Sequence, residues 1–312
     1  MEHFVFTDNV KIAIGILYAF ILIVMGILKI SQTFFKKDLE NLWIRMKSFL
    51  FIVIFFTVAF CFNHICAFLF LILISYLCLK EFLSLIPIRK TDRNVILWAY
   101  LSIPITYYII YIHWVTLFYL FIPLYMFILI SARMVLSSNT DGFLKNLAVL
   151  QYGLMTTVYA LGYLGLIAII PMQYNPQGGA LGLLFYILVL TVANDFMQMF
   201  SGKLFGKHKI IPKVSPNKTW EGFIGGIIGT TILSVVMAHF LTPFNLWQSA
   251  LAGFVLAIFG FFGDVTMSAI KRDLGIKDTS SLIPGHGGIL DRFDSIIFTA
   301  PVIFYLSSVL IS

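Results

Sequence analysis

Charged residues are scarce in this chain of 312 residues. Only 11% are Asp, Glu, Lys or Arg, whereas 60% are hydrophobic and the mean hydropathy is +0.96. A water-soluble domain needs a polar surface, and this composition supplies too few charges to cover one. The sequence therefore excludes an ordinary soluble enzyme and favours an integral membrane protein.

Cysteine is also scarce, and several catalytic motifs are missing. The three cysteines, Cys61, Cys66 and Cys78, lie in apolar segments, and their spacing fits no common zinc site, so we expect them to pack as apolar residues. The absence of G-x-x-x-x-G-K-[ST], H-E-x-x-H and G-x-S-x-G disfavours a Walker-type ATPase, a zincin and an α/β-hydrolase. Glu2 and Asp8 replace the basic start of a cleavable signal peptide, so we expect none.

Uncharged runs near the length that crosses ~30 Å of hydrocarbon as a helix dominate the chain. Asn63-His64 interrupts the longest run, Phe49–Leu79, so we expect two helices joined by a turn there. The sequence predicts an all-α, polytopic transmembrane protein forming a single integral membrane domain over residues 1–312, with N-terminal helices in 1–175 and the motif-bearing part in 176–312. About ten spans are expected, near residues 10–29, 48–62, 65–79, 94–112, 114–132, 147–170, 180–200, 222–241, 246–267 and 295–311.

Lysine and arginine gather in alternate connections between these spans. With the N-terminus outside, 20 of the 21 basic residues fall on the inward side, and only Lys11 lies at the opposite boundary. By the positive-inside rule, the basic connections face the cytoplasm. The net charge of +7 then reflects membrane topology rather than a nucleic-acid partner.

The first of two long polar connections on the predicted cytoplasmic side is Gly202–Gly222. Pro216 suits the first turn of the helix that follows, and Lys218 lies beside that helix N-terminus, which is a natural anion site. The structural alternative is a basic interfacial loop with a capped helix. Asp195, at the end of the preceding apolar run, is an intramembrane carboxylate that either forms a structural hydrogen bond or lies near a cation.

The second polar connection, Ser268–Ser295, combines three kinds of phosphate-handling group. Backbone N–H groups of the turn Pro284–Gly288 could form an anion nest. Basic side chains and hard oxygen ligands suited to magnesium accompany it, and Asp291 and Asp294 would share a helix face. Each feature alone is common, but within 31 residues of an apolar chain they indicate a phosphate-handling site. The residues concerned are Lys271, Arg272, Lys277 and Arg292, with Asp264, Asp278, Asp291 and Asp294.

The run S-x2-K-R-x4-K-D-x-S-x2-I-P-G-H-G-G-x2-D-R-x-D, from Ser268 to Asp294, resembles the phosphatidate cytidylyltransferase (CDP-diacylglycerol synthase) family. Gly263-Asp264 and the segment Ser215–Gly222 look like two further motifs of that family, and the resemblance covers about residues 190–296. It implies that CTP and phosphatidic acid give CDP-diacylglycerol and pyrophosphate, with magnesium, at the cytoplasmic face of a bacterial inner membrane. The partners would be CTP, phosphatidic acid and the lipid bilayer, and a homodimer is left open.

The resemblance also implies a role for each site residue. Mg²⁺ would be held at Asp264, Asp291 and Asp195, and a monovalent cation such as K⁺ could share the site. Catalytic roles are expected for Lys271, Asp278 and Asp294. Substrate phosphates would be bound by Lys218, Arg272, Lys277, His286, Gly287, Gly288 and Arg292.

The sequence departs from the family pattern at three places. Met267 stands where an acidic residue is usual, residues 196–199 (Phe-Met-Gln-Met) replace Thr/Ser-x-Ala-Tyr after Asp195, and Asn217 replaces a common Lys. These departures leave open a different acidic lipid as the acceptor.

Two other functions also stay open. A nucleotide-dependent lipid kinase would transfer a γ-phosphoryl group and release a nucleoside diphosphate. A transporter or flippase of an anionic solute would place polar residues at the membrane midplane, whereas here they gather toward one face.

Overall fold

The computed structural model describes residues 7–35, 40–87, 93–136, 140–282 and 287–311. Within these ranges, ten helices are long and apolar enough to cross a membrane, which confirms the predicted all-α, multi-span class. The elements are α1 (Asp8–Phe35), α2 (Glu40–Phe62), α3 (His64–Ser84), α4 (Arg93–Tyr111), α5 (Val115–Leu120), the π-helix η2 (Phe121–Met126), α6 (Phe127–Val135), α7 (Phe143–Leu154), the π-helix η3 (Met155–Ala160), α8 (Leu161–Ala168), the 3-10 turn η4 (Met172–Tyr174), α9 (Gly179–Phe205), α10 (Trp220–Leu241), α11 (Leu246–Asp273) and α12 (Leu290–Ile311).

Two pairs of short α-helices join through π-turns into single long helices. The segment α5–η2–α6 forms one span, Val115–Val135, and α7–η3–α8 forms another, Phe143–Ala168. The predicted break at Asn63-His64 is confirmed: α2 ends at Phe62, α3 begins at His64, and Asn63 caps α3 by accepting a hydrogen bond of 2.8 Å from the Cys66 backbone N–H. The main difference from expectation is length: several helices extend beyond their predicted ends.

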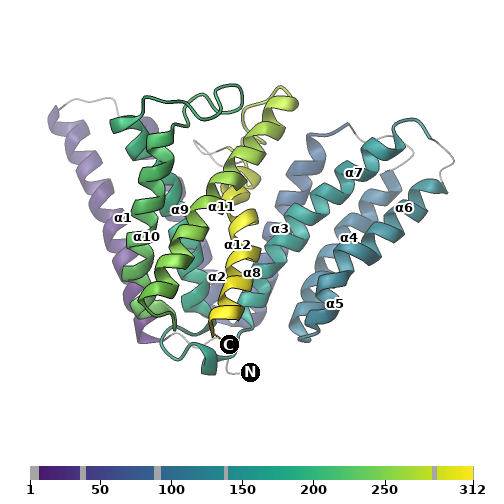
Figure 1. The fold of residues 1–312 in the computed structure, drawn as a ribbon, viewed down its shortest axis with the longest axis horizontal. Coiled ribbons are helices and arrows are strands. Elements are labelled where there is room, and N and C mark those ends of the chain that lie inside the picture. The colour runs from purple at the N-terminus through teal and green to yellow at the C-terminus, as the bar shows by residue number, and fades with distance from the viewer. Residues whose placement is uncertain (1–6, 36–39, 88–92, 137–139, 283–286, 312) are drawn as a thin grey trace.

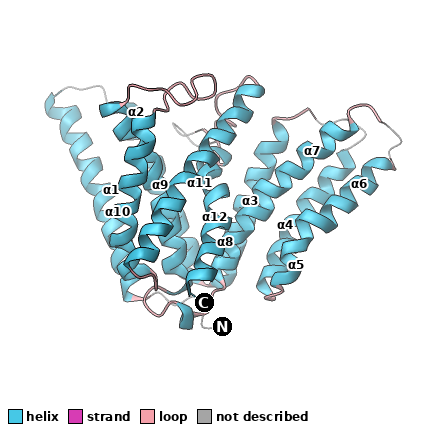
Figure 2. Ribbon diagram, viewed as in Figure 1, coloured by secondary structure: helices cyan, strands magenta, loops and turns pink. Residues whose placement is uncertain are grey.

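The four C-terminal helices form a continuous packed group. Helix α10 packs along α9 and α11, and α11 packs along α12 (Figure 1). The α9–α10 and α11–α12 connections lie at the end of the molecule opposite to the start of α1 and the end of α12 (Figures 1 and 2). The two polar connections singled out from the sequence are therefore brought to the same end.

A glycine lets α11 and α12 approach closely beside the predicted site. A Cβ atom at Gly263 would lie 2.6 Å from the Asp294 carbonyl oxygen and 3.0 Å from the Ser295 Cα. Small residues at helix contacts are typical of membrane proteins, where packing rather than water exclusion holds helices together. Gly263 thus brings Asp264, its neighbour on α11, close to the start of α12.

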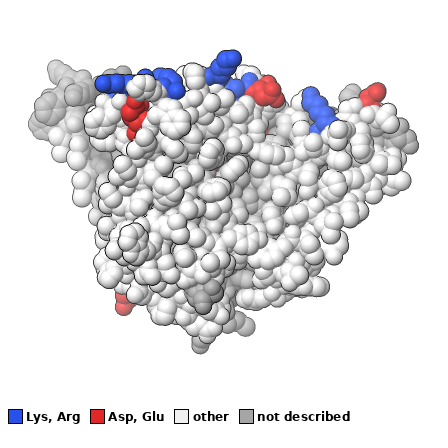
Figure 3. Space-filling view, viewed as in Figure 1, with Lys and Arg blue, Asp and Glu red and all other residues white. Residues whose placement is uncertain are grey.

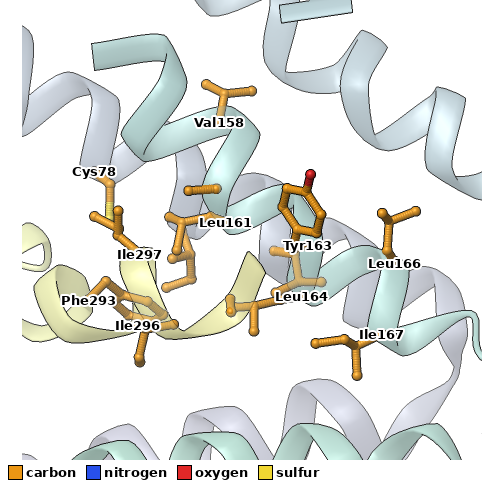
Figure 4. Packing of buried hydrophobic residues seen from close by; sticks show 14 of the residues in the cluster. Cys78, Val158, Leu161, Tyr163, Leu164, Leu166, Ile167, Phe293, Ile296 and Ile297 are labelled. Atoms are coloured by element: carbon orange, nitrogen blue, oxygen red, sulfur yellow. The ribbon is translucent and has the colours of Figure 1, made fainter. Parts of the chain in front are cut away.

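Helices from the N-terminal part support α12 from its other side. Figure 4 shows Phe293, Ile296 and Ile297 of α12 packed with Leu161 of α8 and Cys78 of α3. Cys78 is a free thiol with 0% exposure, in agreement with its expected role as an apolar packing residue. The helix that carries Asp291 and Asp294 is therefore fixed by both parts of the chain.

Basic side chains are confined to one end of the face shown in Figure 3, the end that carries the polar connections. The flanks are apolar: Ile16 on α1 and Ile232 on α10 are 65% and 62% exposed, and many large hydrophobic side chains are exposed with them. An apolar belt below a charged end is the surface expected of a protein that spans a bilayer.

Candidate active site

The helices α11 and α12 extend into the segment that the sequence suggested was a long polar connection. Helix α11 continues to Asp273 and α12 begins at Leu290, so the loop between them covers residues 274–289 only. Lys271 and Arg272 lie in the last turn of α11, where basic side chains favour the negative end of the helix dipole. Asp291 lies in the first turn of α12, where a carboxylate is favoured.

An ion pair between Lys271 and Asp291 joins the two helices. The Lys271 Nζ lies 2.7 Å from the Asp291 Oδ1, and the two side chains are 12% and 3% exposed. The Asp291 Oδ2 accepts three more hydrogen bonds, from the Thr279 backbone N–H (2.8 Å), the Thr279 hydroxyl (2.9 Å) and the Gly288 N–H (2.9 Å). Asp291 thus organises the loop, and it takes up one of the N–H groups of the predicted anion nest.

The backbone at Gly287 is fitted to this arrangement. Its φ angle is +82°, a conformation that side chains disfavour, and an added Cβ would lie 2.8 Å from the Asp291 Oδ2. Glycine is therefore required here both by conformation and by the close approach of the carboxylate.

A second ion pair joins the α9–α10 connection to α11. The Lys218 Nζ lies 2.5 Å from the Asp264 Oδ2, and these side chains are 18% and 24% exposed. Lys218 also donates to the Gln198 Oε1 at 3.0 Å and lies 5.5 Å from the centre of the Phe261 ring. The lysine is therefore held between α9 and α11, at the edge of the buried region.

The rest of the α9–α10 connection is folded back on itself. Its two arms meet at an antiparallel bridge between Lys209 and Thr219, and the Thr219 hydroxyl caps α10 by accepting from the Gly222 N–H. Glu221 accepts hydrogen bonds from the backbone N–H groups of Lys207 and His208. These contacts, typical of a capped helix start, place Lys218 at the top of α10.

Carboxylates on three helices surround the close α11–α12 contact. Asp294 of α12 lies near Asp264 of α11 and Asp195 of α9. The Ser295 hydroxyl also lies within 3.3 Å of both oxygens of Asp195. Asp294 is only 7% exposed, so this carboxyl group is largely shielded from water.

The remaining predicted residues are less closely assembled. The Arg272 Nε donates to the Val214 carbonyl oxygen at 3.3 Å and so links the two connections. Lys277, Asp278 and Arg292 are exposed, and in the described ranges Lys277 forms no hydrogen bond or ion pair with another predicted site residue. His286 lies outside the described residues, as do Pro284 and Gly285.

The donor chemistry fits a hard cation, although no ready-made cage is present. Among the described residues, no group of three or more His, Cys, Asp or Glu side chains is arranged as metal ligands. Asp264 and Asp291 are each paired with a lysine, whereas Asp294 and Asp195 bring further carboxylate oxygens toward Asp264. Carboxylate oxygens from several helices are suitable ligands for Mg²⁺, which also needs substrate phosphates and water.

Sequence reasoning missed a third buried carboxylate at this end of the molecule, Glu81 of α3, beside Asp291 and Asp294. Its two oxygens accept hydrogen bonds from the hydroxyls of Thr279 and Ser280 and from the N–H groups of Ile289 and Leu290. The only signal in the sequence is that Glu81 ends a long apolar run. Because that run lies outside the family motifs, nothing connected it to the site.

The departures from the family pattern differ in their surroundings. Phe196 and Met199 are 54% and 48% exposed on the outer side of α9, so two of the four unusual residues face away from the site. Gln198 faces inward and holds Lys218. Met267 is buried, so an apolar side chain occupies the position of the usual acidic residue.

The fold and the candidate site together describe a polytopic membrane protein with paired lysines and carboxylates gathered at one end of its helices. The chain belongs to the cytidylyltransferase family, whose model matches residues 43–310. Its ten apolar helices, counted among the described residues, make it a membrane-spanning member of that family.

Individual relatives agree with this membership. The chain is 46% identical over 236 residues to the Escherichia coli protein named "Uncharacterized protein YnbB", covering 76% of this chain and 77% of that protein. It is 42% identical over 135 residues to a phosphatidate cytidylyltransferase of Mycobacterium leprae, covering 43% of each. A Haemophilus influenzae phosphatidate cytidylyltransferase is 42% identical over 137 residues, covering 42% of this chain and 47% of that protein. The chain therefore spans about half the length of these phosphatidate cytidylyltransferases.

Proposed function

We propose that this protein transfers the cytidylyl group of CTP to phosphatidic acid, giving CDP-diacylglycerol and pyrophosphate for phospholipid synthesis. Membership of the cytidylyltransferase family supports the use of CTP, and the two phosphatidate cytidylyltransferases support the lipid acceptor. The observation that carries the proposal is the convergence of both motif-bearing connections, through Lys218–Asp264 and Lys271–Asp291, on one site at the end of membrane-crossing helices. The comparisons offer no support for a lipid kinase or a transporter.

The chemistry requires positive charge more than a covalent nucleophile. A phosphate oxygen of phosphatidic acid attacks the α-phosphorus of CTP, and the bond from that phosphorus to pyrophosphate breaks. Both substrates are anions, so they repel each other until positive charge is placed between them. Lys218, Lys271 and Arg272 surround the site and would neutralise and orient the phosphates. Before substrate binds, the two lysines are neutralised by Asp264 and Asp291, which limits the cost of keeping charges away from water.

The donor set also supports the expected Mg²⁺. Asp264 would hold the ion together with Asp195 and Asp294, and Asp291 would join only if it exchanged Lys271 for the metal. When bound, the ion supplies electrostatic stabilisation of the phosphate oxygens as charge develops on them. A second cation such as K⁺ remains a prediction, as do the separate roles of Asp278 and Lys277.

Location and assembly extend the proposal. Ten apolar helices in the part of the chain that the structure describes, together with bacterial relatives, indicate a multi-pass membrane protein. The basic end would face the cytoplasm of the bacterial inner membrane by the positive-inside rule, which gives the site access to cytosolic CTP. A homodimer is testable from the mass of the detergent-solubilised particle after correction for bound detergent.

A direct assay tests the acceptor. Purified protein in detergent is supplied with CTP, magnesium and short-chain phosphatidic acid, and CDP-lipid and pyrophosphate are quantified, with ATP in place of CTP and magnesium-free buffer as controls. Equal amounts of the two products are expected. If other acidic lipids react and phosphatidic acid does not, the acceptor is wrong while cytidylyl transfer stands.

A further inference from the structure

Glu81 is a buried carboxylate that links the N-terminal helices to the candidate site. It lies near the end of α3 and is 7% exposed. Its Oε1 accepts from the Ser280 hydroxyl at 2.8 Å and from the Ile289 N–H at 3.0 Å. Its Oε2 accepts from the Leu290 N–H at 2.9 Å and from the Thr279 hydroxyl at 3.1 Å. One side chain therefore binds the middle of the loop between α11 and α12 and the point where that loop meets α12.

The contacts at the far end of this loop set the start of α12. The N–H groups of Ile289 and Leu290 have no carbonyl partner within the helix, because the first residues of a helix lack one. Glu81 supplies the missing acceptor and places its negative charge at the positive end of the helix dipole. The position and direction of the first turn of α12, which carries Asp291, therefore depend on α3.

The contacts in the middle of the loop reach Asp291 through shared atoms. The Thr279 hydroxyl lies 3.1 Å from the Glu81 Oε2 and 2.9 Å from the Asp291 Oδ2, so a single proton serves two carboxylates. An added Cβ at Gly288 would lie 2.9 Å from the Glu81 Cδ, so glycine is needed for this approach. Thr279 and Gly288 are the residues that donate hydrogen bonds to Asp291. Glu81 holds the same two segments, because it accepts from Thr279 and from Ile289, the neighbour of Gly288.

We propose that Glu81 is a positioning residue for cytidylyl transfer, acting through the loop and the first turn of α12 on Asp291 and its partner Lys271. This inference rests on the proposed function. Glu81 does not touch the reacting groups: it fixes the geometry of the residues that do. Because small displacements of positioned groups lower the rate of the chemical step more than they weaken binding, the effect should fall on kcat.

The first test is the steady-state kinetics of Glu81→Gln, which keeps the side-chain size but removes the charge and half of the acceptor capacity. We expect kcat to fall roughly 10- to 100-fold, the range seen when a group that orients site residues is removed. The KM values for CTP and phosphatidic acid should change by less than about threefold. Lys80→Gln, an exposed charge change at the adjacent position of α3, is the matched control and should leave both constants near wild type.

A double-mutant cycle tests whether Glu81 acts through the loop. The Ser280 hydroxyl donates to Glu81, so Glu81→Gln and Ser280→Ala should have combined effects on kcat that are smaller than the product of the single effects. Lys80→Gln and Ser280→Ala should combine independently. Independent effects of Glu81→Gln and Ser280→Ala would overturn the proposed route.

Hydrogen exchange gives a readout that does not need activity. The N–H groups of Ile289 and Leu290 should exchange more slowly in the wild type and in Lys80→Gln than in Glu81→Gln, while the core of α12 keeps its protection. If the wild type is active and Glu81→Gln changes neither kcat nor hydrogen exchange, the role proposed for Glu81 is overturned, whereas the proposed function stands. A folded wild type that forms no CDP-lipid overturns the proposed function, and the exchange data then still report whether Glu81 holds the loop.

Discussion

Lys271 of α11 and Asp291 of α12 form an ion pair, with 2.7 Å between the Nζ and Oδ1 atoms and side-chain exposures of 12% and 3%. The two residues are 20 positions apart in sequence, and the pair closes the loop that carries the glycine-rich turn. The two partners are not equivalent, since the Asp291 carboxylate accepts three further hydrogen bonds from Thr279 and Gly288.

This inequality predicts an order of stability. Asp291→Asn removes the charge that four donors share and leaves the Lys271 ammonium poorly compensated, so it should destabilise the protein by about 3 kcal/mol. Lys271→Met leaves Asp291 with its other three donors and should cost less. Thermal unfolding in detergent measures the order, and a lower Tm for Lys271→Met than for Asp291→Asn would contradict it.

Asp264 should matter for the reaction more than for folding. Its side chain is 24% exposed and pairs with Lys218, so Asp264→Asn should leave insertion and Tm nearly unchanged. We expect kcat/KM to fall about 100-fold or more, equivalent to roughly 3 kcal/mol of transition-state stabilisation. Asp273→Asn, an exposed change on the same helix, is the control. Near-normal turnover of Asp264→Asn would remove this residue from the magnesium site.

Gly263 should be intolerant of any side chain. The methyl group of Gly263→Ala would meet the backbone of Asp294 and Ser295 at 2.6–3.0 Å, and backbone cannot move aside cheaply. The variant should lose about 1–3 kcal/mol of stability and much of its activity, because α11 and α12 must separate. Gly15→Ala in α1, where an added Cβ meets no atom within 4 Å, should be neutral. Equal behaviour of the two variants would contradict the described helix contact.

Much of this fold follows from composition and periodicity alone. The ten spans were predicted because each needs a long apolar run, and the break at Asn63-His64 was predicted because polar residues interrupt one. Helix ends were less predictable: charged residues such as Lys271 and Asp291 lie on α11 and α12 rather than in a loop, since helix termini tolerate charges of the appropriate sign.

The site was predictable only in part. Its motif residues were identified, but the pairing of Lys218 with Asp264 and of Lys271 with Asp291 depends on how α9 to α12 pack, which the sequence alone does not specify. Glu81 was missed because its importance comes from the position of α3 against α12, nearly 200 residues away in sequence: the Ser280 contact spans 199 positions.

The direction of insertion is open to chemical labelling. In a variant without the three native cysteines, Lys213→Cys in the α9–α10 connection should be protected from a membrane-impermeant thiol reagent in intact cells. Gln173→Cys, between α8 and α9 at the opposite end, should react. The reverse pattern would place the candidate site outside the cytoplasm and contradict the proposed supply of CTP.

The most direct test of the account follows the phosphorus atoms of CTP. Purified protein is given phosphatidic acid, magnesium and CTP labelled either at the α- or at the γ-phosphorus, and the label is measured in lipid and in pyrophosphate. Cytidylyl transfer predicts that the α-label enters the lipid and the γ-label leaves in pyrophosphate. Entry of the γ-label into the lipid, with release of CDP, would show a lipid kinase and contradict the central claim.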